Sequence, residues 1–322
     1  MKEIYIAQVN AGEELTSFFM VKAIAVKMGS NKKYYMDLLL GDKTGEISGK
    51  KWDVADEEIE AARAIVPGEV LKIRAQVTEW NGMKQLRVSR IRKTGKEDGI
   101  DITDYIKAAP EPAEEMYAFI LDKARGLTDK DLCALCTKVL EDNKERLLYY
   151  PAASKNHHAE MAGLLWHIKR MLMTGEQICG VYTGLDKNLV FAGVMLHDIE
   201  KLNEIQSNEF GISDGYSFEG QMLGHIVQGI RELDKEMEAL NFPREKAVMV
   251  EHMILSHHYE PEFGSPKRPL FPEAELLHYL DVIDARMYDM EDALSKTQPG
   301  EFSDRVWTLD NRRLYKRLEA EK

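Results

Sequence analysis

Residues 188–202 read "NLVFAGVMLHDIEKL", an apolar run that ends in an adjacent imidazole and carboxylate, His197 and Asp198. The run is apolar almost all round, which predicts a helix at the centre of a helical core. Burying a histidine and an aspartate without partners costs free energy. A divalent cation removes that cost because it accepts neutral imidazole nitrogen and ionised carboxylate oxygen together. The segment therefore predicts a buried helix with a metal site at its end.

The other histidines support this interpretation. All nine in the chain lie between His157 and His278, a stretch of 122 residues. Most stand in segments whose apolar residues recur at helical spacing. Helix bundles build metal sites from side chains that point inward from facing helices. We therefore expect several helices to contribute to one centre; their segments read "HHAEMAGLLWHIKRMLMTGEQI", "SFEGQMLGHIVQGIREL", "REKAVMVEHMILSHHYEP" and "PEAELLHYLDVIDARMYDM".

Residues 15–92 show a different pattern, with strand-like segments separated by turn signals. Asn81-Gly82, between the last two of these segments, is the strongest short hairpin signal. A helical patch, "DEEIEAARAI", stands between the third and fourth segments. Five strands with a helix in that place are the order of a small OB barrel. The segments read "FFMVKAIAV", "KYYMDLLL", "GEISGKKW", "EVLKIRAQVTEW" and "MKQLRVSRI".

The composition changes after the last strand-like segment. Residues 96–115 carry two prolines and many acids, as linkers do. Beyond them we see no strand-rich stretch. We therefore predict two domains: an all-β OB barrel for nucleic-acid binding at 1–95, then a linker at 96–115 and an all-α helical domain at 116–322.

Charge and composition limit the function classes. The net charge is −12, which argues against a protein that binds nucleic acid over its whole surface. The charge is uneven, however. Residues 1–100 hold 17 Lys and Arg and 15 Asp and Glu, whereas residues 101–322 hold 26 Lys and Arg and 40 Asp and Glu, so the negative charge lies in the second part of the chain. Three cysteines are too few for a disulfide framework, no apolar run approaches the ~20 residues of a membrane span, and no secretory signal is evident. We predict a cytoplasmic protein with no membrane contact.

The motifs resemble a known family. The order His167, His197-Asp198, Asp281 resembles the H…HD…D signature of the HD superfamily of metal-dependent phosphohydrolases. The segments "GLLWHI", "LHDIEKL", "EGQMLGHI", "ILSHH" and "LHYLDVIDARM" are similar in wording and order to the bacterial YhaM-type 3′ to 5′ exoribonucleases. Those proteins join an N-terminal OB domain to an HD domain, and "LLLGDKTGEISGKKWD" resembles their OB signature. The resemblance covers essentially the whole chain and implies an HD-type helical domain.

The resemblance also implies a ligand set. One metal ion would be held by His167, His197, Asp198 and Asp281, and a second by Asp198, His225 and His257. The implied cofactor is a divalent transition metal, one ion or two, with Mn²⁺ first and Co²⁺, Fe²⁺ or Zn²⁺ as alternatives. Two neighbouring ions can activate a water and clamp the oxygens of a phosphodiester.

Several further residues are assigned around this set. We give catalytic roles to Asp198 and to Lys201, which follows three residues later and can meet a phosphate oxygen. His258 is either a substrate contact or a core histidine. Many HD enzymes have glycine where this chain has Glu200, a carboxylate that either reaches substrate or faces solvent. His157 and His158 are expected at the surface or against substrate.

The barrel would bind the nucleic acid. A loop between its first two strands brings Lys32 and Lys33 next to Tyr35, and the last hairpin adds Trp80 and Lys84. Cations that follow a phosphate backbone and aromatic rings that stack on bases are what single-stranded nucleic acid requires. The alternation of strand side chains places only one of two adjacent tyrosines on the binding face.

The function predicted from the sequence is a 3′ to 5′ exoribonuclease acting on single-stranded RNA, with DNA as a second substrate left open. Two alternatives remain: an HD phosphodiesterase acting on a small nucleotide or cyclic dinucleotide, and a nucleic-acid-binding protein whose HD domain is inactive. A homo-oligomer is compatible with the acidic helical surface.

Overall fold

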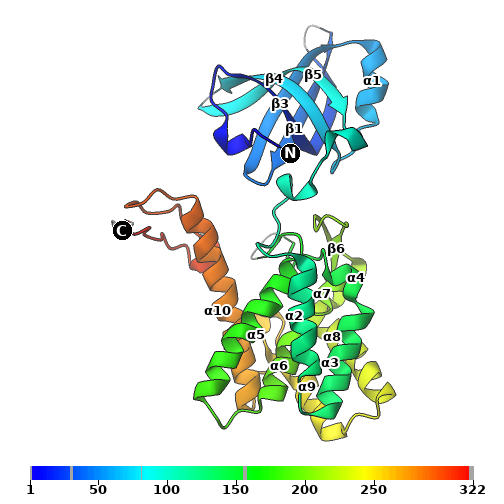
Figure 1. The fold of residues 1–322 in the computed structure, drawn as a ribbon, viewed down its shortest axis with the longest axis vertical. Helices are drawn as coiled ribbons and strands as arrows, with labels where there is room; N and C mark the ends of the chain where they lie inside the picture. The colour runs from blue at the N-terminus through cyan, green and yellow to red at the C-terminus, as the bar shows by residue number, and fades with distance from the viewer. Residues whose placement is uncertain (1, 30–31, 81, 155–157, 319–322) are drawn as a thin grey trace. The chain divides into compact units, whose positions relative to one another are not determined.

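The computed structural model describes the whole chain except residues 1, 30–31, 81, 155–157 and 319–322, together with the side chains of residues 56 and 57. The chain divides into two compact units, Met1–Ala108 and Ala109–Lys322 (Figure 1). The segment predicted as a linker, 96–115, is therefore shared between them. Its first part belongs to the barrel unit because Tyr105 is buried there and the Asp104 carboxylate accepts hydrogen bonds from Tyr5 and Lys43.

The first unit is a closed barrel of five strands in the order β1-β2-β3-β5-β4. Strand β1 pairs with both β2 and β4, and β3 closes the barrel by pairing in parallel with β5. A helix stands between the third and fourth strands, as the sequence predicts. The elements are β1 (Glu14–Met28), β2 (Tyr34–Asp42), β3 (Gly45–Val54), α1 (Asp56–Arg63), β4 (Val70–Trp80) and β5 (Met83–Lys93), with the 3-10 turns η1 (Ile6–Gln8), η2 (Lys96–Asp98) and η3 (Ile102–Asp104).

Alternation of side chains fills the barrel. In β4, Leu71, Ile73, Ala75 and Val77 point inward and are buried, while the residues between them are not. The predicted hairpin forms, since β4 and β5 pair up to Trp80 and Met83 on either side of the turn. Asn81 itself lies outside the described residues.

The second unit is built mainly of helices. It also contains one short two-stranded hairpin, of β6 (Ile205–Ser207) and β7 (Ser213–Tyr216), which follows α7. These strands are too short to show a period. The helices are α2 (Ala113–Arg125), α3 (Lys130–Asp142), α4 (Lys144–Leu147), α5 (Gly163–Val181), α6 (Lys187–Leu196), α7 (Lys201–Glu204), α8 (Phe218–Ala239), α9 (Arg244–Ser256) and α10 (Pro272–Ser295), with the turns η4 (Pro261–Phe263) and η5 (Trp307–Leu309).

Helix α6 is the centre of the helical unit, with α3, α5, α9 and α10 packed around it. Every residue from Leu189 to Leu196 is buried, which explains why this stretch of the sequence is apolar all round. Asp186 caps its N-terminus by accepting a hydrogen bond from the backbone of Asn188. Two of the cysteines, Cys133 and Cys136, lie on α3, where Cys136 is part of the core. None of the described helices is both long enough and apolar enough to cross a bilayer.

Candidate functional site

Five helices bring the histidines and aspartates together at the end of α6. His197 is the residue that ends α6, and Asp198 follows in the next turn. The other contributions come from the middle of α5, from a kink in α8, from the end of α9 and from the middle of α10. The six converging residues are His167, His197, Asp198, His225, His257 and Asp281.

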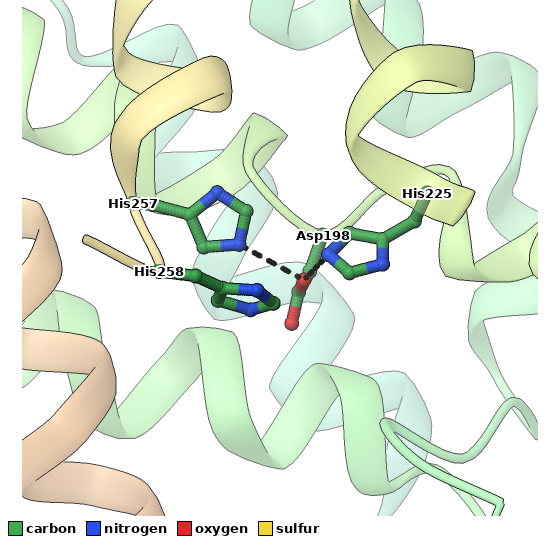
Figure 2. A group of neighbouring side chains, drawn as sticks. All are labelled: Asp198, His225, His257 and His258. Carbon is green, nitrogen blue, oxygen red and sulfur yellow. Dashed lines mark ion pairs between the residues drawn. The ribbon is translucent and has the colours of Figure 1, made fainter. Parts of the chain in front are cut away.

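Asp198 stands between two sets of imidazoles. Its Oδ2 lies 3.3 Å from His197 Nε2 and 3.7 Å from His167 Nε2. Its Oδ1 lies 3.3 Å from His225 Nε2 and 3.8 Å from His257 Nε2. Figure 2 shows His225 and His257 both directed at this carboxylate. The two oxygens of one aspartate therefore face two different histidine pairs.

The four imidazoles share one feature: each has its Nδ1 hydrogen-bonded to an acceptor on the side away from Asp198. The acceptors are the Asp284 carboxylate for His167, the Val194 carbonyl for His197, the Glu204 carboxylate for His225 and the Ile254 carbonyl for His257. With Nδ1 donating, Nε2 of a neutral ring carries the lone pair that binds a metal. All four lone pairs are thus aimed at the same place.

The polar atoms at the centre lack the partners that burial demands. Within the described part of the chain, Asp198 Oδ1, His225 Nε2 and His257 Nε2 are buried and make no hydrogen bond. Leaving such atoms unsatisfied is expensive. Nitrogen and carboxylate donors that lie within 4.8 Å of one another form the sets Asp198–His225–His257–His258, His167–His197–Asp198 and His197–His257–Asp281. This donor chemistry fits one or two divalent transition-metal ions.

The electrostatics agree with that fit. Burial holds the pKa of His257 well below its ordinary value, so this ring is neutral and free to bind a cation. Burial alone would raise the pKa of Asp198, but Lys201 and His197 bring it well below the usual range. Burial alone would also lower the pKa of His167, yet its bonds to Asp281 and Asp284 raise it to about 10, so in the metal-free protein this ring carries a proton that a bound metal ion would displace. The aspartates are ionised, as metal ligands must be.

Lys201 is fixed beside the centre. Its Nζ lies 2.6 Å from Asp198 Oδ2, and the side chain is almost fully buried. Burial would lower its pKa, but Asp198 and Asp281 outweigh burial and raise it, so the group keeps its positive charge. His258 lies near the same centre (Figure 2). Its Nδ1 donates a hydrogen bond to the Phe263 carbonyl, 2.6 Å away.

Glu200 takes no part in this cluster. Its Oε2 accepts a hydrogen bond from Asn203 Nδ2, and burial raises its pKa. It lines a separate groove of about 490 Å³, together with Gln228 and several acidic residues. Of the other histidines, His252 accepts from the Leu270 backbone N–H and His278 donates to the His257 carbonyl, so both have structural roles.

Asp284 holds His167 in place; the sequence suggested that Asp284 supports the ligands or packs the helix, but not which residues it contacts. Asp284 accepts hydrogen bonds from His167 Nδ1 at 2.7 Å and from His158 Nε2 at 2.8 Å. Its other oxygen lies 2.6 Å from Arg170 Nε. The expectation that His158 lies at the surface or against substrate is wrong, because its side chain is fully buried against this carboxylate. The reason is local: α5 begins only at Gly163, and the chain before it turns inward. His157 lies outside the described residues.

A break in α8 holds His225. Gly224 interrupts the helix with φ 68° and ψ 164°, a conformation that is open essentially to glycine alone. Glu204 then accepts hydrogen bonds from both the backbone N–H and the Nδ1 of His225, at 3.0 and 3.1 Å. The kink and the carboxylate together turn the imidazole toward Asp198.

We expect Gly224→Ala to lower the free energy of unfolding of the helical unit by about 1–3 kcal/mol, because a side chain at this φ is strained. Metal affinity should also fall, since His225 is displaced. Gly180→Ala is the matched control: Gly180 lies in helix α5, and an added Cβ would meet nothing within 4 Å. Thermal unfolding and metal titration of both variants test this. Equal behaviour of the two would show that the kink is dispensable.

The barrel carries a second candidate site on strands β3, β4 and β5. A groove of about 400 Å³ is lined by Trp52 and Trp80 with Lys50 and Arg87. Trp52 stacks on Tyr35 with ring centroids 4.8 Å apart, and Lys50 Nζ lies 5.8 Å from the Trp52 ring centre. The sequence reasoning missed Trp52, although "GKKWD" offered a signal, a tryptophan beside two lysines in a strand.

The barrel residues predicted to contact nucleic acid differ in their exposure and in their bonds within the barrel. Trp80 is 68% exposed, and the partly buried Tyr35 stacks on the exposed Trp52. Lys32 is exposed in the loop before β2, and Lys33 lies 3.0 Å from the Asp53 carboxylate. Lys84 Nζ donates to the Val9 carbonyl at 2.7 Å, so part of its donor capacity serves the barrel itself. The groove therefore depends on Trp52, Trp80 and Arg87 more than on the lysines of the loop.

We expect Trp52→Ala to weaken binding of single-stranded nucleic acid by about 1–3 kcal/mol, the usual contribution of one stacked base. Val66→Ala serves as the control, because Val66 is 55% exposed on the barrel and does not line the groove. Fluorescence anisotropy with a labelled oligonucleotide measures both. Unchanged affinity in Trp52→Ala would rule out this groove as the binding surface.

Comparison with protein families gives a match in the helical unit. Residues 164–286 match the family model described as HD domain, and this range contains all six converging residues. The prediction of an OB-type barrel followed by a helical HD domain is confirmed.

The chain is also similar to parts of several solved structures. One is a replication protein A heterotrimer bound to ssDNA, at 15% identity and TM-score 0.22 over 27% of this chain and 61% of that chain. Another is the second OB-fold domain of replication protein A from Methanococcus maripaludis, at 19% identity and TM-score 0.23, which covers 28% of this chain and 92% of that chain. A third is asparaginyl-tRNA synthetase from Pyrococcus horikoshii, at 14% identity and TM-score 0.24, which covers 44% of this chain and 36% of that chain. The chain thus spans less than two thirds of the first and third of these.

Proposed function

We propose that this protein is a metal-dependent phosphodiesterase that shortens single-stranded RNA from its 3′ end. The observation that carries the proposal is the convergence of four imidazole Nε2 atoms on the two oxygens of Asp198, with buried atoms that lack partners among the described residues. A hydrolytic metal centre explains both the geometry and the unsatisfied atoms.

The residues divide into two sets that would hold two ions. His167 and His197 lie toward Oδ2 of Asp198, with Asp281 Oδ1 3.4 Å from His167 Nε2, and His225 and His257 lie toward Oδ1. When bound, such ions lower the pKa of a water and neutralise the phosphate oxygens during in-line displacement. Mn²⁺ is the ion we expect first, with Co²⁺, Fe²⁺ or Zn²⁺ as alternatives, since a mixed set of nitrogen and oxygen donors accepts each of them.

The protein's own groups act around this centre. Lys201 keeps its charge and would stabilise a non-bridging phosphate oxygen as negative charge grows on it. His258, held by the Phe263 carbonyl, would contact the substrate at the same centre. Buried acceptors fix the tautomer of each ligating histidine, so little reorganisation is needed during the reaction.

The barrel supports a polymeric substrate. Exposed Trp52 and Trp80 beside Lys50 and Arg87 offer stacking surfaces next to cations, which is the combination that binds single strands. A small nucleotide would need no such groove. The preference for RNA and the 3′ to 5′ direction rest on the resemblance to the YhaM-type exoribonucleases.

The test is incubation of the full chain and Mn²⁺ with single-stranded RNA labelled at its 5′ end. The expected product is a ladder of progressively shorter labelled strands. A 3′-phosphorylated or circular RNA should be cut slowly or not at all, and a DNA strand of equal sequence measures sugar preference. His197→Ala should abolish the ladder, whereas His252→Ala, which changes a histidine outside the cluster, should not.

Two other outcomes would overturn the proposal. Intact RNA beside a hydrolysed cyclic dinucleotide would assign the centre to a small substrate. Binding of RNA with no hydrolysis of either substrate under any of the four metals would make the protein a binding module.

A further inference from the structure

The barrel has a second groove beside the one lined by the two tryptophans. It has a volume of about 500 Å³ and opens where β3 and β5 part, since these strands pair only between residues 48–50 and 85–87. Trp52 and Arg87 line both grooves, so the two adjoin on the outer face of the barrel. The charged side chains that line the second groove are Glu14, Lys51, Asp53, Arg74, Arg87 and Arg90.

A β-bulge gives this groove its row of arginines. The pairing of β4 with β5 shifts by one residue between Arg74 and Ala75, so β5 has an extra residue there. Because of that residue, Arg87 and Arg90 both point outward although they stand three positions apart. Both are exposed, whereas Val88 between them is buried. Arg90 also lies directly opposite Arg74 on β4.

Two of these arginines lack an acidic partner. The acids that line the groove, Glu14 and Asp53, already form ion pairs with Arg74 and with a lysine outside the groove. Arg87 and Arg90 form no ion pair with any residue that the structure describes. The groove therefore offers positive charge to a ligand.

A single-stranded nucleic acid fits this combination of groups. Trp52 and Trp80 are 49% and 68% exposed, so bases can stack on them. Side chains that point outward recur at every second residue of β4, and this row spans about 20 Å from Trp80 to Arg74. A strand whose bases stack at the tryptophan end can therefore reach the arginines with its phosphates. An acidic peptide would use the arginines but has no need of the indole rings.

We propose that Arg74, Arg87 and Arg90 form a phosphate track that continues the tryptophan groove, so that a single-stranded nucleic acid runs along β4 and β5. The track rests on the proposed function only for the kind of polymer that is bound. Arginine suits the role, because its guanidinium group donates several hydrogen bonds to one phosphate.

This path differs from the common one in OB barrels, which bind oligonucleotides on strands 2 and 3 and on the loops after strands 1 and 4. In this chain two of the lysines beside the first of those loops, Lys27 and Lys33, already form ion pairs with carboxylates. The two arginines without acidic partners lie instead on β5.

The test is fluorescence anisotropy with the full chain, a chelator and a labelled oligouridine of about 16 nucleotides, at salt concentrations from ~50 mM to ~1 M. Each phosphate contact contributes about 0.7 to the slope of log affinity against log salt. Arg87→Ala and Arg90→Ala should each reduce the slope by that amount, which weakens binding about 8-fold at ~50 mM salt and hardly at all at ~1 M. Arg87→Lys should keep the slope, since one positive charge suffices to release a counterion.

The tryptophans should respond differently. Trp80→Ala should weaken binding about 10-fold or more at every salt concentration and leave the slope unchanged, because stacking involves no counterion. Arg63→Ala is the matched control for the charge: Arg63 is an exposed arginine of α1 that lines neither groove. It should change neither the affinity nor the slope. Circular dichroism establishes that each variant is folded.

Three results would overturn the track. They are a wild-type slope in the double variant Arg87→Ala/Arg90→Ala, an equal fall of the slope in Arg63→Ala, and binding of polyglutamate as tight as that of RNA with the same variants impaired. The outcome is separate from that for hydrolysis. The expected slopes without any cleavage of RNA would support the track while the proposed activity fails, and cleavage with unchanged slopes would remove the track alone.

Discussion

Asp198→Asn should lower kcat/KM for RNA hydrolysis by about 10³-fold or more, a loss at the upper end of that seen when one charged catalytic contact is removed. Asparagine keeps the size of the side chain but cannot offer two anionic oxygens. Oδ1 and Oδ2 of Asp198 face different histidine pairs, so the change reaches both proposed ion positions at once. Calorimetric titration of the metal-free chain should show weaker binding at both.

The control for this prediction is Asp142→Asn on α3, an aspartate that makes an ion pair with Lys138 at the surface. It should leave activity and metal binding unchanged. Asp198→Asn should retain the wild-type circular dichroism spectrum, since the fold does not depend on the metal ligands for its apolar core. If it kept more than about a tenth of the wild-type rate at saturating metal, the centre described here would not be the catalytic one.

Asp284→Ala should weaken metal binding by about 10- to 100-fold, the range found when groups that orient metal ligands are removed. Asp284 does not face the centre, but it fixes His167 through a 2.7 Å hydrogen bond. The same carboxylate binds the buried His158 and the partly buried Arg170, so its loss removes a buried acceptor from His158 and one of two ion pairs from Arg170. The free energy of unfolding should therefore fall by about 3–5 kcal/mol as well.

Two further variants separate these effects. Asp284→Asn keeps an oxygen that accepts from His167, so it should recover part of the metal affinity while the pair with Arg170 stays weakened. Asp289→Ala removes another carboxylate from the same helix and should change neither quantity. A loss of stability in Asp284→Ala with unaltered metal affinity would mean that His167 is held by its surroundings alone.

The sequence was most informative where the pattern is local. Alternation in "EVLKIRAQVTEW" and the Asn81-Gly82 turn predicted the barrel because each strand signal lies within a few residues. The run from Leu189 to Leu196 predicted a buried helix for the same reason. The motif residues stand on separate predicted helices, and they meet because those helices pack against one another.

Partners distant in sequence could not be predicted. Asp284 is 126 residues from His158, and Glu204 is 21 residues from His225, so their contacts depend on how the helices pack. Trp52 was missed because the face on which a strand residue lies depends on register and on the curvature of the barrel. The hairpin of Ile205–Ser207 and Ser213–Tyr216 is too short to show a period.

The burial of α6 has a consequence for how the site responds to heat. Amide hydrogens in a helix enclosed on all sides exchange with solvent only when the surrounding helices come apart. The amides of Leu189 to Leu196 should therefore be among the slowest to exchange with deuterium. Because His197 and Asp198 directly follow that helix, these two residues should stay in place while the core is intact. Heat inactivation and the cooperative melting of the helical unit should coincide.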